Sequence, residues 1–262
     1  DGVERGYATL AAAVAAVEDG GTITLLTNAS GSGIGTFLNT ANGAKTAVKD
    51  FTINFDNHTY TCTGPAVGSM GTQSQAFHLE WKGTGNKNAK VTLKNGTISS
   101  TADSGVRMLV QNYCDLTLDN MTLDGTNIGR GQYTLSNNCG NVTIQNCEII
   151  APENGFAFDS CDYANYTGVS VTVKGESEIL GKIERTNPNG GENNARISVQ
   201  SGTFSDVSAL NYLAAGADVA VELGESATQS TTIPADATVA LDLNGKTLTN
   251  DCLLYTSDAA DD

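Results

Sequence analysis

The chain has 262 residues, 39% hydrophobic and only 16% charged, so it can bury a core and is not a disordered tail. Its formal net charge of −15 argues against binding to nucleic-acid phosphates or anionic lipid surfaces. No apolar run of about 18 residues is present, so no membrane insertion by a helix is expected. Gly is abundant at 29 and Pro scarce at 4, which indicates many turns rather than a Pro-rich linker.

The two ends of the sequence indicate a piece of a longer protein. It begins at Asp1 without a methionine or a signal-peptide pattern. Residues 251–262, which include CLLYTSDAADD, abandon the pattern that precedes them and resemble a translated sequencing adapter of a metagenomic reading frame. We therefore expect one domain over residues 1–250. Five cysteines remain in it without a CxxC pair, which favours small buried residues over disulfides or a zinc site: Cys62, Cys114, Cys139, Cys147 and Cys161.

Residues 7–20 predict the one helix. Thr9 can cap its start, and Gly20 ends it. Three apolar residues share one face: Leu10, Val14 and Val17. A strand over residues 21–26 follows at once, so we expect the helix to cover the open end of a β-structure.

The main feature of the chain is an internal repeat. Residues 114–126 match residues 140–151, with Leu118 answering to Ile144 at an offset of 144 − 118 = 26. The same inward apolar position can be followed along the chain as Phe55, Leu93, Leu118, Ile144, Val173, Val199 and Leu243. Two places later a bend is expected, because most residues there enter the left-handed region easily: Asn57, Asn95, Asn120, Asn146, Gly175, Ser201 and Gly245. A second inward residue then follows: Tyr60, Ile98, Leu123, Ile149, Ile179, Phe204 and Leu248.

A third strand precedes each of the first repeats, near residues 35, 76, 107, 132 and 155. Alternation predicts its inward residues as Phe77, Leu79, Met108, Val110, Tyr133, Leu135, Phe156 and Phe158. Three strands in each turn of about 25 residues predict an all-β right-handed parallel β-helix, with residues 208–250 forming final, less regular coils.

This repeat pattern resembles that of the pectin-lyase-like superfamily of β-helices over nearly all of residues 1–250. The family's asparagine ladder is matched by Asn57, Asn95, Asn120 and Asn146. Residues 202–223 and 239–250 resemble repeats of large adhesin-like surface proteins of gut bacteria. The resemblance implies that any activity on polysaccharide lies on the outer face of the first strand of each coil.

An acid–base pair is hard to assemble on that face. A glycosidase needs two carboxyls about 5 to 9.5 Å apart. Glu80 and Asp159 lie three coils apart, which is roughly 14 Å at strand spacing. Residues 140–158 resemble a polygalacturonase region but lack its Asn-Thr-Asp triplet. If the chain is an enzyme, its catalytic candidates are Asp159, Glu80 and Arg107.

Binding residues can also be named. Trp81 is the best exposed aromatic, and His78, Glu80 and Gln111 are expected beside it on the outer face, where they could contact sugar. No cofactor is indicated. Calcium is the one ion that Asp115, Asp119 and Asp124 could bind, although solvated strand and turn positions explain them as well.

The sequence therefore favours a protein without catalysis. We expect a secreted or surface-anchored bacterial β-helix fragment, monomeric within a longer chain, that presents a surface for adhesion or contact with a polysaccharide or host glycan. The alternatives are a polysaccharide lyase or glycoside hydrolase acting on acidic polysaccharide, or a structural stalk with no ligand.

Overall fold

The structure is a computed structural model that describes residues 4–36, 49–68, 72–80, 88–163 and 168–249. It is an all-β protein built from parallel strands, as the repeat predicts. The elements in chain order are α1 (Leu10–Ala16), β1 (Gly21–Thr24), β2 (Ala29–Gly31), β3 (Ile34–Gly35), β4 (Phe51–Cys62), β5 (Gln75–Leu79), β6 (Lys90–Ser100), β7 (Met108–Asn112), β8 (Asp115–Asp124), β9 (Tyr133–Asn137), β10 (Asn141–Gln145), β11 (Glu148–Ile150), β12 (Phe156–Cys161), β13 (Ser170–Lys174), β14 (Glu178–Leu180), β15 (Lys182–Thr186), β16 (Arg196–Phe204), the 3-10 helix η1 (Val207–Tyr212), β17 (Leu213–Glu222), β18 (Ala227–Thr228), β19 (Thr238–Asp242) and β20 (Leu248–Thr249).

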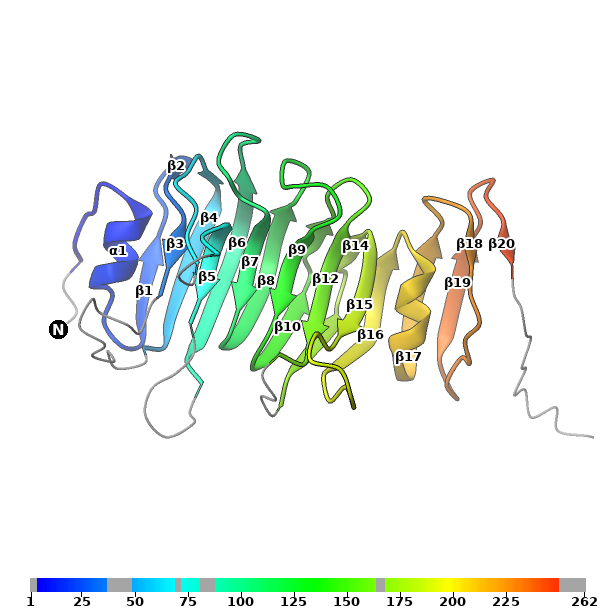
Figure 1. Cartoon of the computed structure of the whole chain (residues 1–262). Helices are drawn as coiled ribbons and strands as arrows, with labels where there is room; N and C mark the ends of the chain where they lie inside the picture. The colour runs from blue at the N-terminus through cyan, green and yellow to red at the C-terminus, as the bar shows by residue number, and fades with distance from the viewer. Residues whose placement is uncertain (1–3, 37–48, 69–71, 81–87, 164–167, 250–262) are drawn as a thin grey trace, which may run out of the picture.

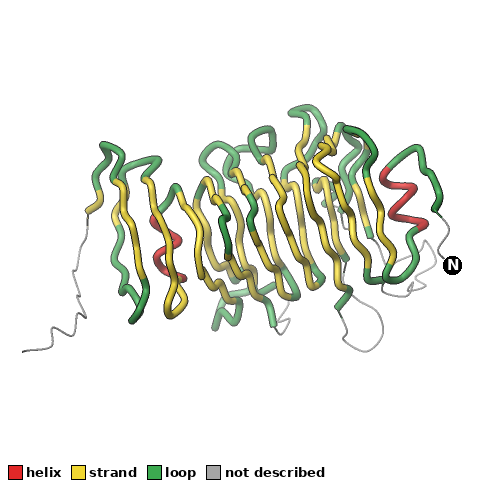
Figure 2. Tube along the Cα trace, turned by 180° about the vertical axis from the view of Figure 1, so that it is seen from behind, coloured by secondary structure: helices red, strands yellow, loops and turns green. Residues whose placement is uncertain are grey.

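Two large sheets run side by side along the molecule. The larger, sheet A, has twelve strands, in which β4, β6, β8, β10, β13 and β16 are successive neighbours. The smaller, sheet B, has six strands in the order β15-β12-β9-β7-β5-β3. Figures 1 and 2 show the strands stacked in chain order from the N-terminal helix to β19. Sheet B takes one strand from each successive repeat, whereas sheet A takes the segments on both sides of the bend, such as β10 and β11. Equivalent residues of successive repeats therefore lie next to one another.

The strand pairing in sheet A shows which residues occupy equivalent positions in successive repeats. One inward row pairs Ile53, Leu93, Leu118, Ile144, Val173 and Val199 on adjacent strands. The predicted first member, Phe55, is wrong, because the pairing is irregular between Asn54 and His58 and Ile53 takes the position. The predicted last member, Leu243, is also wrong: Leu241 pairs with Val221, which pairs with Phe204 of the second inward row. The second inward row is otherwise as predicted from Tyr60 to Phe204.

The bend between the two rows uses left-handed backbone, as expected. Asn57, Asn95, Asn120 and Asn146 have φ of 64°, 59°, 54° and 52°. In the first repeat Asn54 takes the place predicted for Asn57 in the amide ladder, because Asn95 Nδ2 donates to Asn54 Oδ1 at 3.1 Å. Asn120 Nδ2 then donates to Asn95 Oδ1 at 3.2 Å. The ladder is a structural device that joins neighbouring repeats.

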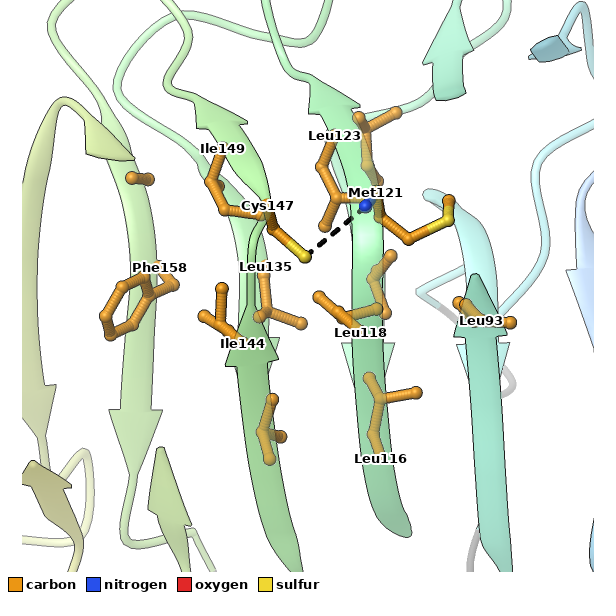
Figure 3. Close-up of a cluster of buried hydrophobic side chains, with 14 of the residues drawn as sticks. Leu93, Leu116, Leu118, Met121, Leu123, Leu135, Ile144, Cys147, Ile149 and Phe158 are labelled. Carbon is orange, nitrogen blue, oxygen red and sulfur yellow. Dashed lines mark hydrogen bonds between the residues drawn. The ribbon is translucent and has the colours of Figure 1, made fainter. Parts of the chain in front are cut away.

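The core lies between the sheets. Figure 3 shows Leu93, Leu118 and Ile144 from successive strands of sheet A, with Leu135 and Phe158 from sheet B. All five are fully buried, and they belong to one hydrophobic cluster that extends from Leu10 to Leu223. The five cysteines outside residues 251–262 are buried, which confirms their interpretation as small interior residues.

Sheet B departs from the expected alternation at the first residue of β7, β9 and β12. Phe77, Leu79, Val110, Leu135 and Phe158 are buried as predicted, but Met108, Tyr133 and Phe156 are only partly buried and lie outside the core cluster. In each of these strands the next two residues are both fully buried, as Thr134 and Leu135 are in β9. In β12 this coincides with an irregular pairing to β15 between Phe156 and Phe158.

The two ends of the stack differ. Helix α1 buries Leu10, Ala13 and Val14 at the N-terminal end, with Thr9 accepting a hydrogen bond from Ala12 N at 3.1 Å (Figure 1). It ends at Ala16, earlier than the predicted residue 20, because Val17 takes an extended ψ of 137°. At the other end η1, which follows β16 in the chain, hydrogen-bonds to β15 through Ser208 and Tyr212. Leu241 and Leu243 remain 43% and 42% exposed. The predicted adapter tail lies outside the described residues.

Candidate functional site

The outer face of sheet B carries a row of five different polar side chains in register. His78 pairs with Gln111, Gln111 with Ser136, Ser136 with Asp159, and Asp159 with Glu184. These residues alternate with the buried Phe77, Val110, Leu135, Phe158 and Ile183. We call this row, with the outward Tyr133 and Phe156, the sheet B face.

Hydrogen bonds organise the first part of the sheet B face. His78 Nδ1 lies 2.9 Å from Gln111 Oε1, and its Nε2 lies 3.0 Å from Glu80 Oε2. The ring is tilted against that of Tyr113, with centroids 5.5 Å apart. His78 has no solvent exposure, whereas the Glu80 side chain is 29% exposed. The expectation that His78 contacts a ligand directly is therefore wrong; it lies between two oxygens and orients Gln111 and Glu80.

The middle of the face continues the network across strands. Ser136 Oγ donates to Asn138 Oδ1 at 3.0 Å, and Asn138 Nδ2 donates to Tyr113 OH at 2.9 Å. Neighbouring side chains are thus fixed by one another, which preorganises the polar surface.

A carboxyl pair lies at the end of the face. Asp159 and Glu184 are register partners on β12 and β15, so their backbones are about 4.8 Å apart. Asp159 is 3% exposed; its Oδ2 accepts from Thr186 Oγ1 at 2.8 Å, and its Oδ1 has no partner among the described residues. Tyr133 OH donates a short hydrogen bond to Glu184 Oε1.

The environment shifts the protonation of this pair. Burial raises the pKa of Asp159 to about 7, against the lowering effect of the nearby Ser136 and Thr186 hydroxyls, and the Glu184 charge raises it further. Burial also raises the pKa of the Tyr133 hydroxyl, with its hydrogen bond to Glu184 as a second cause. A carboxyl with such a pKa is a general-acid candidate.

Aromatic rings lie beside the carboxyl pair. Tyr133 and Phe156 are stacked, with centroids 4.9 Å apart and an interplanar angle of 23°. Both are partly exposed. Partly exposed aromatic rings next to a fixed hydrogen-bonding group suit contact with a sugar, because a sugar ring has an apolar C–H face and a polar rim.

The predicted catalytic residues are not brought together. Glu80 and Asp159 lie on opposite parts of the sheet B face, with β7 and β9 between β5 and β12. Arg107 is exposed just before β7, beside the Gly129 loop. Trp81 lies outside the described residues. Asp159 instead meets Glu184, which the sequence interpretation missed, although residues 182–186 show the same inward–outward alternation in Ile183 and Glu184.

The calcium candidates serve as hydrogen-bond acceptors. Asp115 Oδ1 accepts from Asn88 Nδ2 at 3.0 Å and from Asn141 N at 2.9 Å. Asp124 Oδ1 accepts from Thr126 N at 3.0 Å and from Thr126 Oγ1 at 2.7 Å. Across the part of the chain that the structure describes, no three His, Cys, Asp or Glu side chains are grouped to hold a metal.

Comparison with known proteins yields no match among protein-family models, curated proteins or solved structures. Among the described residues, no helix is long and apolar enough to cross a membrane. The function must therefore be argued from the site itself.

Proposed function

We propose that the chain is a right-handed parallel β-helix of the pectin-lyase-like kind, from a secreted or cell-surface bacterial protein, and that its sheet B face contacts carbohydrate without catalysis. The β-helix is supported by parallel pairing of each repeat with the next, and by steps of 118 − 93 = 25 and 144 − 118 = 26 residues between paired positions.

The observation that carries the carbohydrate contact is the Tyr133–Phe156 stack beside Glu184. The two partly exposed rings offer apolar contact area, and Glu184 offers an acceptor next to them. The hydrogen bond from the Tyr133 hydroxyl holds Glu184 in place before any ligand arrives, which reduces the entropy lost on binding.

A glycan array followed by titration of any bound oligosaccharide tests this proposal. Wild type is expected to bind, and a Tyr133→Ala/Phe156→Ala double variant is expected to lose binding about ten-fold or more. The matched control is Thr117→Ala/Thr143→Ala, which changes two partly buried side chains on the outer face of sheet A. Two outcomes would contradict the proposal: an equal loss of glycan affinity in both double variants, or no glycan bound by the wild type. Either would favour a structural stalk that binds no ligand.

Catalysis is the second candidate, and the Asp159–Glu184 pair favours it. Adjacent-strand spacing matches the roughly 5 Å between carboxyls in retaining glycosidases, with Asp159 as acid and Glu184 as nucleophile. We rank it second because Asp159 is 3% exposed and Glu184 Oε1 is already engaged by Tyr133, so neither carboxyl is presented to a glycosidic oxygen. Release of reducing ends from polysaccharide that vanishes in both Asp159→Asn and Glu184→Gln, but persists in Glu80→Gln, would reverse this ranking.

A further inference from the structure

A separate cavity of about 580 Å³ lies where β12 and β15 of sheet B end and β13 and β16 of sheet A begin. The segment after β15, which includes Glu192, Asn193 and Asn194, forms one wall. This volume is within the range of small-molecule sites. The cavity shares none of its lining residues with the sheet B face.

One buried acceptor in the cavity lacks a partner. Asp162 is 2% exposed, and its Oδ2 accepts from Asn194 N at 2.8 Å and from Asn194 Nδ2 at 3.3 Å. Its Oδ1 is buried and has no hydrogen-bond partner among the described residues. A buried carboxylate oxygen without a donor is unfavourable, so a ligand that brings one gains affinity.

Two guanidinium groups line the same cavity. Arg185 Nη1 donates to Ala195 O at 3.3 Å, and the guanidinium carbon lies 5.9 Å from the centre of the Tyr212 ring. Within the described part of the chain, neither Arg185 nor Arg196 forms an ion pair, although acidic residues outnumber basic ones by 29 to 14. Unpaired arginines present their remaining N–H groups to an oxyanion, and a planar carboxylate can accept two of them.

We propose that this cavity binds a hydroxylated carboxylate of monosaccharide size, such as a hexuronic acid. The ligand carboxylate pairs with Arg196 and Arg185, and one of its hydroxyls donates to Asp162 Oδ1. This inference goes beyond the carbohydrate contact proposed for the sheet B face and does not depend on it.

The charges of the cavity select this class over simpler ligands. Asp162 and Glu192 also line the wall, so an inorganic phosphate would meet repulsion as well as attraction. A neutral hexose would satisfy Asp162 but leave both arginines without an anion. A sugar acid supplies both an anion for the arginines and a hydroxyl donor for Asp162.

Saturation-transfer NMR and calorimetry with the whole chain test the proposal, using glucuronate, galacturonate, glucose and inorganic phosphate as probes. Saturable binding of a uronate is expected, with glucose and phosphate at least about ten-fold weaker, because a charge-assisted hydrogen bond contributes more than 1.4 kcal/mol. Arg196→Gln is expected to weaken uronate binding by about ten-fold. Its side chain is exposed, so the variant should fold.

Two further variants locate the site. Asp162→Asn replaces the acceptor by a donor and is expected to lower affinity while Asn194 remains bound, which an unchanged Tm would show. Arg130→Gln is the control, because Arg130 pairs with Glu153 at 3.1 Å outside the cavity. Absence of uronate binding by wild type, glucose binding of equal strength, or full affinity in Arg196→Gln would overturn the proposal. Loss of uronate binding in Tyr133→Ala/Phe156→Ala would do the same, because it would place the ligand on the sheet B face.

Discussion

The outer faces of sheets A and B share one backbone geometry but differ in their side chains. On sheet A one outward row reads Thr22, Thr52, Thr92, Thr117, Thr143, Thr172 and Ser198, paired strand to strand. On sheet B the row reads His78, Gln111, Ser136, Asp159 and Glu184. Parallel neighbours impose the same spacing on both rows, so the variety on sheet B is not required by the backbone.

The difference teaches where a ligand site should be sought. Threonine suits a half-buried pleated surface, and it occupies six of the seven positions in the sheet A row. Repetition of this kind therefore indicates a structural role. A row in which every side chain differs, and in which side chains hydrogen-bond to one another, indicates a ligand site. The predictions that follow test this distinction.

The largest expected effect concerns Asp159 on the non-repeating row. Its pKa is about 7 in the folded protein against an ordinary value of 3.8. Between these values the unfolded chain loses its proton first, so the free energy of unfolding falls as pH rises from about 4 to about 7. The decrease has an upper bound of about 4 kcal/mol at 1.36 kcal/mol for each pKa unit.

Urea denaturation at several pH values checks this, with Asp159→Asn as the comparison. The variant cannot ionise, so its stability relative to wild type should increase through that pH window and level off above it. A constant difference between the two proteins from pH 4 to pH 8 would show that Asp159 is not held protonated.

The next largest effect is expected from substituting Asn112, which pairs in register with a second buried asparagine, Asn137, on the neighbouring strand. Asn112 Nδ2 donates to Cys114 O at 2.7 Å, to Asn137 Oδ1 at 2.9 Å and to Cys139 O at 3.1 Å, and the residue has no exposure. Asn112→Ala leaves these buried acceptors short of a donor, so we expect a loss of about 3 kcal/mol in the free energy of unfolding. Chemical denaturation measures it. A loss below about 1 kcal/mol would contradict the view that repeating polar residues maintain the fold.

Tyr133→Phe removes only the hydroxyl that donates to Glu184. We expect a loss of about 1 to 2 kcal/mol in stability, because a hydrogen bond to a charged acceptor disappears while the ring stack with Phe156 remains. Glycan binding should fall less than in the Tyr133→Ala/Phe156→Ala variant. Equal binding losses in the two would mean that Glu184, not the aromatic surface, carries the contact.

The repeating features are the ones that sequence reasoning found. Inward residues such as Leu118 and Ile144, and the left-handed Asn120 and Asn146, recur at a near-constant interval, so each supports the assignment of the next. The errors fall where the interval changes. Phe55 and Leu243 are predicted from Asn57 and Gly245 two places after them, whereas an irregular pairing or a shortened repeat puts Ile53 and Leu241 in register.

The candidate site was predictable only in part. The outward position of Asp159 follows from alternation, but its partner Glu184 lies on a strand of five residues with no anchor of its own. The partial exposure of Tyr133 and Phe156 cannot be read from alternation, because two successive buried residues follow each of them. Burial of His78 and Asp159 depends on neighbouring side chains from other repeats, which no single repeat encodes.

The smallest expected effect is on the repeating outer row. Thr117 lies between Thr92 and Thr143 in the register of sheet A and is partly buried. Thr117→Ala removes a β-branched side chain from a strand, so we expect a loss of about 0.5 to 1 kcal/mol in the free energy of unfolding. Glycan binding should be unchanged, because this row lies on a different sheet from Tyr133 and Phe156. Denaturation and glycan titration of one preparation measure both quantities. If binding falls while stability holds, the threonine row is itself a ligand surface, and repetition would no longer distinguish structure from site.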